Sequence, residues 1–189
     1  HRERPRTGTR RRRPPAPPQR SCCRRSLPRR GRPRSGEELL EAGDTFDEVV
    51  GSFTTGGYSG ASGTNIAIVA RTVNGAIVNP GETFSLNGFT GPRGTAQGYV
   101  ESGIILNGRA DTAVGGGISQ FATTLYNAAY FAGMTDVAHT PHSYYISRYP
   151  AGREATVYEG AIDLQFRNDS PYPVRIANSV GGGEVTVSL

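Results

Sequence analysis

Residues 114–129 read VGGGISQFATTLYNAA, three consecutive glycines followed by a helical pattern. Apolar residues recur at helical spacing from Phe121 through Leu125 to Ala128, Ala129 and Ala132, and Gly133 follows. This predicts an amphipathic helix over 119–132. The glycines break the preceding strand and let the backbone approach other groups closely. Ser119 stands at the helix start, where a serine most often acts as the N-cap.

A second helix is predicted upstream of this stretch. Thr64 is a plausible cap, and Ile66, Val69, Ala70 and Val73 follow at i, i+3, i+4 and i+7. Gly75 supplies the stop.

Short strands are predicted on both sides of the two helices. Asn107-Gly108 is typical of a two-residue hairpin turn, and it joins 104–106 to 109–114. A long glycine-rich loop is expected over 87–98, and such loops often carry function. The sequence therefore predicts one compact α+β domain with two main helices and mainly antiparallel short strands. The other expected strands are one within 51–63, followed by a loop, and 76–78, 83–86, 155–158, 162–166, 174–176 and 185–189.

Charge divides the chain into two unlike parts. Residues 1–36 hold fourteen of the 21 basic residues, all Arg, and one acid, which gives a net charge of +13. The remainder has seven Arg and fifteen acids, a net charge of −8. We therefore expect a disordered Arg/Pro-rich tail at 1–36, a linker or short helix at 37–47, and the folded domain at 48–189.

The basic tail has two interpretations. It is either an artefact at the end of a fragment or an arm that binds a polyanion by counterion release. It has no aromatic residue to stack on a base, so nucleic acid is not the expected partner. Cys22 and Cys23 also lie there, and the rest of the chain has no cysteine. The sequence contains no run of eighteen apolar residues, so an export signal or membrane anchor would lie upstream.

Seven short motifs, together with the stretch quoted first, carry a family resemblance. The region 114–129 resembles the signature of the VanW family, in which a glycine triplet precedes an apolar residue, a Cys, a Gln and a helix. The motifs follow in the family's order and cover most of residues 48–178: Gly51-Ser-Phe-Thr-Thr, Asn65-Ile-Ala, Pro80-Gly-Glu-Thr-Phe-Ser-Leu-Asn, Gly91-Pro-Arg, Gly98-Tyr, Pro141-His-Ser and Tyr149-Pro-Ala-Gly-Arg-Glu-Ala-Thr-Val.

The resemblance implies a bacterial envelope protein outside the cytoplasm, in the cell wall or anchored to the membrane. It further implies recognition of peptidoglycan or its stem peptide and a link to glycopeptide resistance. This sequence departs from the family pattern at one position, because Ser119 stands where the family commonly has Cys.

The alternative to recognition is a Ser-dependent amide or acyl hydrolase, or a transferase, acting on peptidoglycan. Ser119 would be the nucleophile, and it requires a close general base because a hydroxyl has a far higher pKa than a thiol. His142 or His139 would be that base, oriented by Glu154 or Asp163. The N–H groups of Gly115, Gly116 and Gly117 would stabilise an oxyanion.

Substrate binding is expected at the glycine triplet, Gln120, His139, Arg153 and Glu154. Arg153 is suited to a carboxylate, which guanidinium binds through two parallel bonds. It has an equally good structural interpretation as an Arg-Glu pair at the start of a strand. His139 and His142 lie three residues apart with no cysteine or carboxylate pair at metal-site spacing, so neither a metal nor a cofactor is expected.

Overall fold

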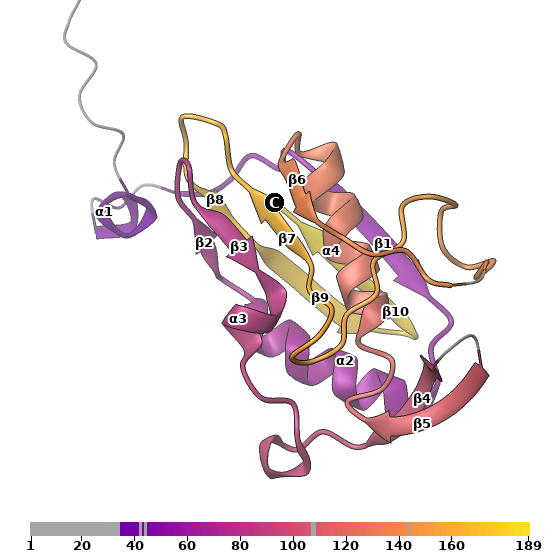
Figure 1. Cartoon of the computed structure of the whole chain (residues 1–189). Coiled ribbons are helices and arrows are strands. Elements are labelled where there is room, and N and C mark those ends of the chain that lie inside the picture. Colours follow the sequence, from indigo (N-terminus) through magenta and orange to yellow (C-terminus); the bar gives the residue numbers. More distant parts are fainter. Residues whose placement is uncertain (1–34, 42, 44, 107–108, 144) are drawn as a thin grey trace, which may run out of the picture. The chain divides into compact units, whose positions relative to one another are not determined.

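The computed structural model describes residues 35–41, 43, 45–106, 109–143 and 145–189. These residues form an α+β fold of short antiparallel strands with two main helices, as predicted (Figure 1). The helices of the described part are α1 (Gly36–Glu41), α2 (Gly60–Val73), α3 (Leu86–Thr90), a 3₁₀ turn at Thr95–Gln97, and α4 (Ser119–Phe131).

All strand pairs are antiparallel, and the central sheet joins the two ends of the domain. It has the order β1-β10-β9, with β1 at Ser52–Gly56, β9 at Ala177–Gly181 and β10 at Glu184–Ser188. Two smaller sheets are β2-β8 (Ile77–Val78, Val174–Arg175) and β3-β7-β6 (Thr83–Ser85, Gln165–Arg167, Thr135–Ala138). The hairpin β4-β5 pairs Glu101–Leu106 with Arg109–Val114.

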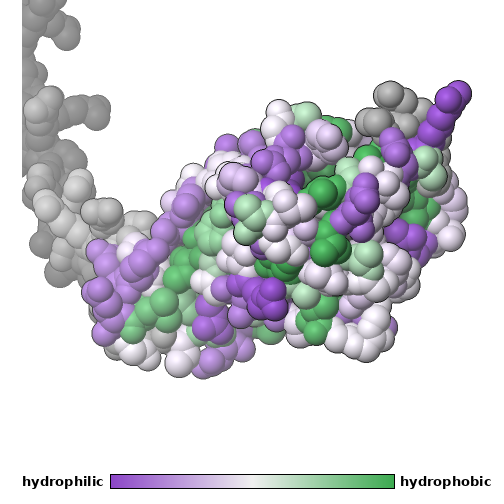
Figure 2. Space-filling view, turned by 90° about the horizontal axis from the view of Figure 1, so that it is seen from below, coloured by the Kyte–Doolittle hydropathy of each residue, from purple (hydrophilic) through white to green (hydrophobic). Residues whose placement is uncertain are grey.

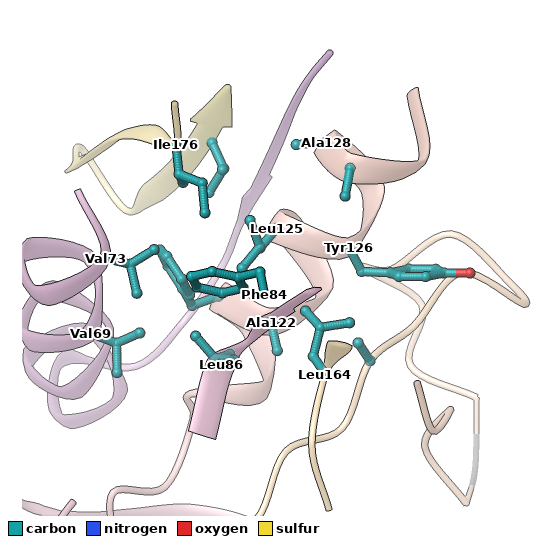
Figure 3. Close-up of a cluster of buried hydrophobic side chains, with 14 of the residues drawn as sticks. Val69, Val73, Phe84, Leu86, Ala122, Leu125, Tyr126, Ala128, Leu164 and Ile176 are labelled. Carbon is teal, nitrogen blue, oxygen red and sulfur yellow. The ribbon is translucent and has the colours of Figure 1, made fainter. Parts of the chain in front are cut away.

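Helix α4 lies against β1 and β10 and forms the centre of the core (Figure 1). Its residues 120–129 are all buried, so it is enclosed rather than amphipathic. Leu125 and Ala122 face Phe84, Leu86 and the side chains of α2 (Figure 3). Burying an aliphatic or aromatic side chain contributes about 1.5–3 kcal/mol, so this cluster holds both helices in place.

Helix α2 begins five residues earlier than the sequence indicated. Ser59, not Thr64, is its N-cap, and the Ser59 Oγ accepts a hydrogen bond from the Ser62 N–H. The predicted apolar face is confirmed, since Ile66, Val69, Ala70 and Val73 are buried. Gly75 follows the helix with a positive φ of 85°, which agrees with the predicted stop.

Other predictions were partly wrong. The expected loop over 87–98 overlaps α3 and contains the 3₁₀ turn. Residues 155–158 form no ladder strand and make only an isolated bridge at Tyr158 and Ile162. The predicted hairpin strands are present, whereas its Asn107-Gly108 turn lies outside the described residues. Strands β6 and β9 were not predicted.

The described surface is mixed in polarity. On the face shown in Figure 2, hydrophobic residues are interspersed with hydrophilic ones. No helix in the described ranges combines the length and hydrophobicity needed to cross a membrane.

Candidate functional site

The glycine triplet forms a tight turn against the β4-β5 hairpin and α2. Gly115 and Gly117 have positive φ angles of 80° and 86°, which favour glycine. Any Cβ on Gly116 would overlap the Ser102 carbonyl, and one on Gly117 would overlap Ser62. The triplet therefore has a packing reason that is independent of any ligand.

The backbone N–H groups of this turn differ in their availability. Gly115 N donates to the Val100 carbonyl and Gly116 N to the Ala113 carbonyl, at 3.1 and 3.0 Å. Within the described residues, the N–H groups of Gly117, Ile118 and Ser119 donate to no partner. The first turn of a helix leaves such donors free, and together they attract an acceptor or an anion.

Ser119 is not the helix cap, contrary to the interpretation from the sequence. The cap position belongs to Ile118, which makes no side-chain cap bond. The Ser119 Oγ instead accepts a hydrogen bond from the Val157 N–H at 3.1 Å, and lies 3.5 Å from the Val157 carbonyl oxygen. The hydroxyl therefore fastens α4 to a neighbouring extended segment.

Two further side chains of α4 continue this contact as a ladder. Thr123 Oγ1 accepts from the Ala155 N–H at 3.1 Å, and Asn127 Nδ2 donates to the Arg153 carbonyl at 2.8 Å. Four helical residues rise about 6 Å, and two extended residues span about 6.6 Å. Ser119, Thr123 and Asn127 therefore match every second residue of 153–157.

The edge of segment 153–157 that faces away from α4 contacts Thr140 and His142. The Thr156 N–H donates to the Thr140 carbonyl at 2.7 Å. His142 Nδ1 lies 2.9 Å from Glu154 Oε2, and the two side chains are only 7% and 6% exposed. Of the two carboxylates proposed to orient His142, Glu154 does so, whereas Asp163 bonds Ser85 and the Asn87 N–H.

An aromatic side chain connects this pair to α4. The Tyr149 ring stacks on His142 with centroids 5.5 Å apart, and its hydroxyl lies 3.5 Å from Gln120 Oε1. Gln120 is itself buried and donates to the Gly56 carbonyl at 2.9 Å. The guanidinium carbon of Arg148 lies over the Tyr149 ring, 4.9 Å from the ring centroid.

Burial lowers the pKa of His142 below its usual value, and the hydrogen bond to Glu154 only partly opposes this effect. The imidazole is therefore neutral at pH 7. A carboxylate beside Nδ1 favours the tautomer in which Nδ1 carries the proton, which leaves Nε2 as an acceptor. Among the described residues, no group hydrogen bonds to Nε2.

These groups line one cleft of about 1450 Å³. Its walls come from the glycine turn and the start of α4, strands β4 and β5, residues 140–143 and 145–149, and residues 156–162. Arg93 and Arg148 bring positive charge to it, and Glu159 brings negative charge. Arg93 is buried, and its guanidinium donates to Asn87 Oδ1 at 2.6 Å.

The structure brings together most, not all, of the residues named from the sequence. Gly115, Gly116, Gly117, Ser119, Gln120 and His142 line the cleft, and Glu154 lies directly behind His142. No hydrogen bond joins Ser119 to His142 among the described residues.

Arg153 and His139 lie outside the cleft lining. The Arg153 guanidinium lies over the rings of Phe53, Tyr130 and Phe131, 5.1–5.9 Å from their centroids. His139 stacks on Tyr126 and contacts Asp136 at 2.6 Å.

Sequence reasoning missed Arg148, Tyr149 and Thr156 as cleft residues. Arg93 stands in the Gly91-Pro-Arg motif, and that motif was a usable signal. Thr156 Oγ1 is buried and has no hydrogen-bond partner among the residues that the structure describes. Within the described ranges, no three His, Cys, Asp or Glu side chains are grouped as metal ligands.

Comparison of the sequence with known proteins finds one family and two similar proteins. The model of the family described as VanW like protein matches residues 61–189. The chain is 37% identical over 125 residues to the uncharacterized protein YoaR of Bacillus subtilis, covering 66% of this chain and 41% of that protein. It is 30% identical over 113 residues to the vancomycin B-type resistance protein VanW of Enterococcus faecalis, covering 56% and 40%.

The chain thus spans about two fifths of the length of these relatives. No solved structure matches it significantly. The matched region contains α4, its ladder to 153–157 and most of the cleft lining. The chain belongs to the VanW family.

Proposed function

We propose that this VanW-family domain is a cell-envelope module that recognises peptidoglycan or its stem peptide outside the cytoplasm. The proposal rests on the cleft, because the glycine turn, Gln120 and His142 all line it. Its lining combines exposed tyrosines with hydrogen-bonding groups, a mixture suited to a glycan or peptide. The relative named for vancomycin resistance supports an envelope role linked to glycopeptides.

Recognition is favoured over catalysis by the state of Ser119. A serine nucleophile needs a base within hydrogen-bonding reach. The Ser119 hydroxyl is engaged with the Val157 backbone, which explains its presence as part of the ladder. The neutral imidazole held by Glu154 is the one observation that favours the alternative, an amide or acyl hydrolase or transferase.

A pull-down of the full chain on purified peptidoglycan tests the proposal. Tyr145 lines the cleft and is 67% exposed, whereas Tyr172 is 73% exposed and lies outside the lining. We expect Tyr145→Ala to weaken retention about tenfold and Tyr172→Ala to retain wild-type binding, because only the first removes a ligand-facing ring. Equal retention of both variants would refute the assignment of the cleft.

The same samples distinguish the enzyme. Mass spectrometry of the soluble fraction should show no new muropeptides with the wild type. Products that disappear with Ser119→Ala would establish the hydrolase instead. Absence of all binding would remove peptidoglycan as the ligand.

A further inference from the structure

The cleft wall presents one hydrogen-bond acceptor together with a row of donors. The acceptor is His142 Nε2, on a side chain that is 7% exposed and whose other nitrogen is held by Glu154. The donors are the N–H groups of Gly117, Ile118 and Ser119, which have no partner among the described residues. His142, Gly117, Ile118 and Ser119 all line the cleft, so a ligand that enters the cleft can reach both the acceptor and the donors.

The two sets belong to one part of the cleft. Tyr149 contacts both sides, since its ring stacks on His142 and its hydroxyl lies 3.5 Å from Gln120 Oε1. Gln120 directly follows Ser119 at the start of α4. Tyr149 therefore connects the imidazole to a side chain of the first turn of the helix.

We propose that this part of the cleft is a subsite for a secondary amide, whose N–H donates to His142 Nε2 and whose carbonyl accepts from the N–H groups of Gly117–Ser119. A secondary amide supplies one donor and one acceptor, which is the complement of this wall. A bare carboxylate would satisfy the N–H groups but would place negative charge or a lone pair against the Nε2 acceptor.

This inference rests on the proposed function and names the group that the cleft recognises. Peptidoglycan offers secondary amides of two kinds, the acetamido groups of its amino sugars and the peptide bonds of its stems. Both have the same hydrogen-bonding chemistry, so the subsite accepts either in principle, and separate probes distinguish them.

The pH dependence follows from the tautomer. As the pH falls below 6.5 and through the lowered pKa of His142, Nε2 gains a proton and becomes a donor. The charged and titratable groups facing His142 are Glu154, Arg148 and Tyr149. Burial raises the pKa of Tyr149, so this group stays neutral in the same range. Amide binding should therefore weaken on acidification.

The experiment is a titration of the ¹⁵N-labelled full chain, followed by NMR. The probes are the tetramer of N-acetylglucosamine, the glucose tetramer cellotetraose as its amide-free control, trialanine, and the trialanine analogue with ester linkages. We expect one amide probe to bind about tenfold more tightly than its control. It should shift the amide signals of Gly117, Ile118 and Ser119 and the ring nitrogens of His142.

Substitution gives a second readout. His142→Leu should abolish the preference for the amide probe, whereas His139→Leu, outside the cleft lining, should retain it. If His142→Leu fails to fold, the wild type is titrated at pH 7.5 and at acidic pH. Binding of the amide probe should then be lost at acidic pH, because Nε2 becomes a donor.

Two outcomes separate this inference from the proposed function. Retention on peptidoglycan without any preference for amide probes, or with shifts confined to other residues, would overturn the subsite alone. Failure to bind both peptidoglycan and the probes would overturn both.

Discussion

At the scale of single residues, the polar side chains of α4 act as substitutes for a neighbouring strand. Thr123 is fully buried, and its hydroxyl accepts from the Ala155 N–H and lies 3.3 Å from the Ala155 carbonyl. Thr123→Val preserves the shape but leaves both buried backbone groups unpaired. We expect a loss of about 1–3 kcal/mol in the free energy of unfolding, measured with urea.

Thr72→Val is the matched control. Thr72 is exposed on α2, and its hydroxyl donates to the Ile68 carbonyl one turn earlier. Its substitution should change the free energy of unfolding by less than about 0.5 kcal/mol. Equal effects at the two threonines would show that the ladder does not stabilise the fold.

At the scale of elements, the glycine turn is the joint between the β4-β5 hairpin and α4. A Cβ at Gly116 would overlap the backbone of Ser102, which belongs to a paired strand and cannot yield without disturbing the hairpin. Gly103 lies beside it in β4 with nothing near its Cβ position. We expect Gly116→Ala to lower the midpoint of thermal unfolding by more than 5 °C, roughly the effect of 2 kcal/mol, or to prevent folding.

Gly103→Ala should stay within about 2 °C of the wild type, because the site has room and alanine restricts the unfolded chain. A wild-type melting point for Gly116→Ala would mean that the turn can relax and that packing does not require glycine at position 116.

The elements also show how far the sequence could be interpreted. Periodicity located α2 because its buried residues recur at helical spacing. It located α4 because its apolar residues do so, although the polar residues between them are buried as well. Residues 155–158 have the composition of a strand, yet side chains of α4 satisfy the backbone of this segment, an arrangement that alternation cannot reveal. The prediction of Ser119 as a cap was wrong because its hydroxyl accepts from the Val157 N–H, which lies 38 residues away in the sequence.

In the candidate site, too, local motifs predicted some residues, whereas contacts between distant residues could not be predicted. The Gly115–Gln120 and His142 positions were predictable from local motifs, and they line one cleft. The pairing of His142 with Glu154 was one of two open alternatives, because sequence distance does not indicate which carboxylate faces an imidazole. Arg153 has the charge for a ligand, but its surroundings are three aromatic rings outside the cleft.

At the scale of the whole molecule, the fold is closed by its last strand. β10 lies between β1 and β9, and Val185, Val187 and Leu189 are at most 5% exposed. Burying three such side chains contributes about 5–9 kcal/mol, which is comparable to the entire stability of a domain. A chain ending at Gly183 should therefore show no cooperative unfolding transition by circular dichroism.

Removal of residues 1–34 provides the opposite comparison. The buried hydrophobic residues of the described fold all lie between Ile66 and Leu189, so this larger deletion should leave the melting temperature within about 2 °C of the full chain. A cooperative transition in the chain ending at Gly183 would show that β1 and β9 can close the sheet without β10. The cleft would then depend on α4 and its ladder rather than on the joining of the two ends of the domain.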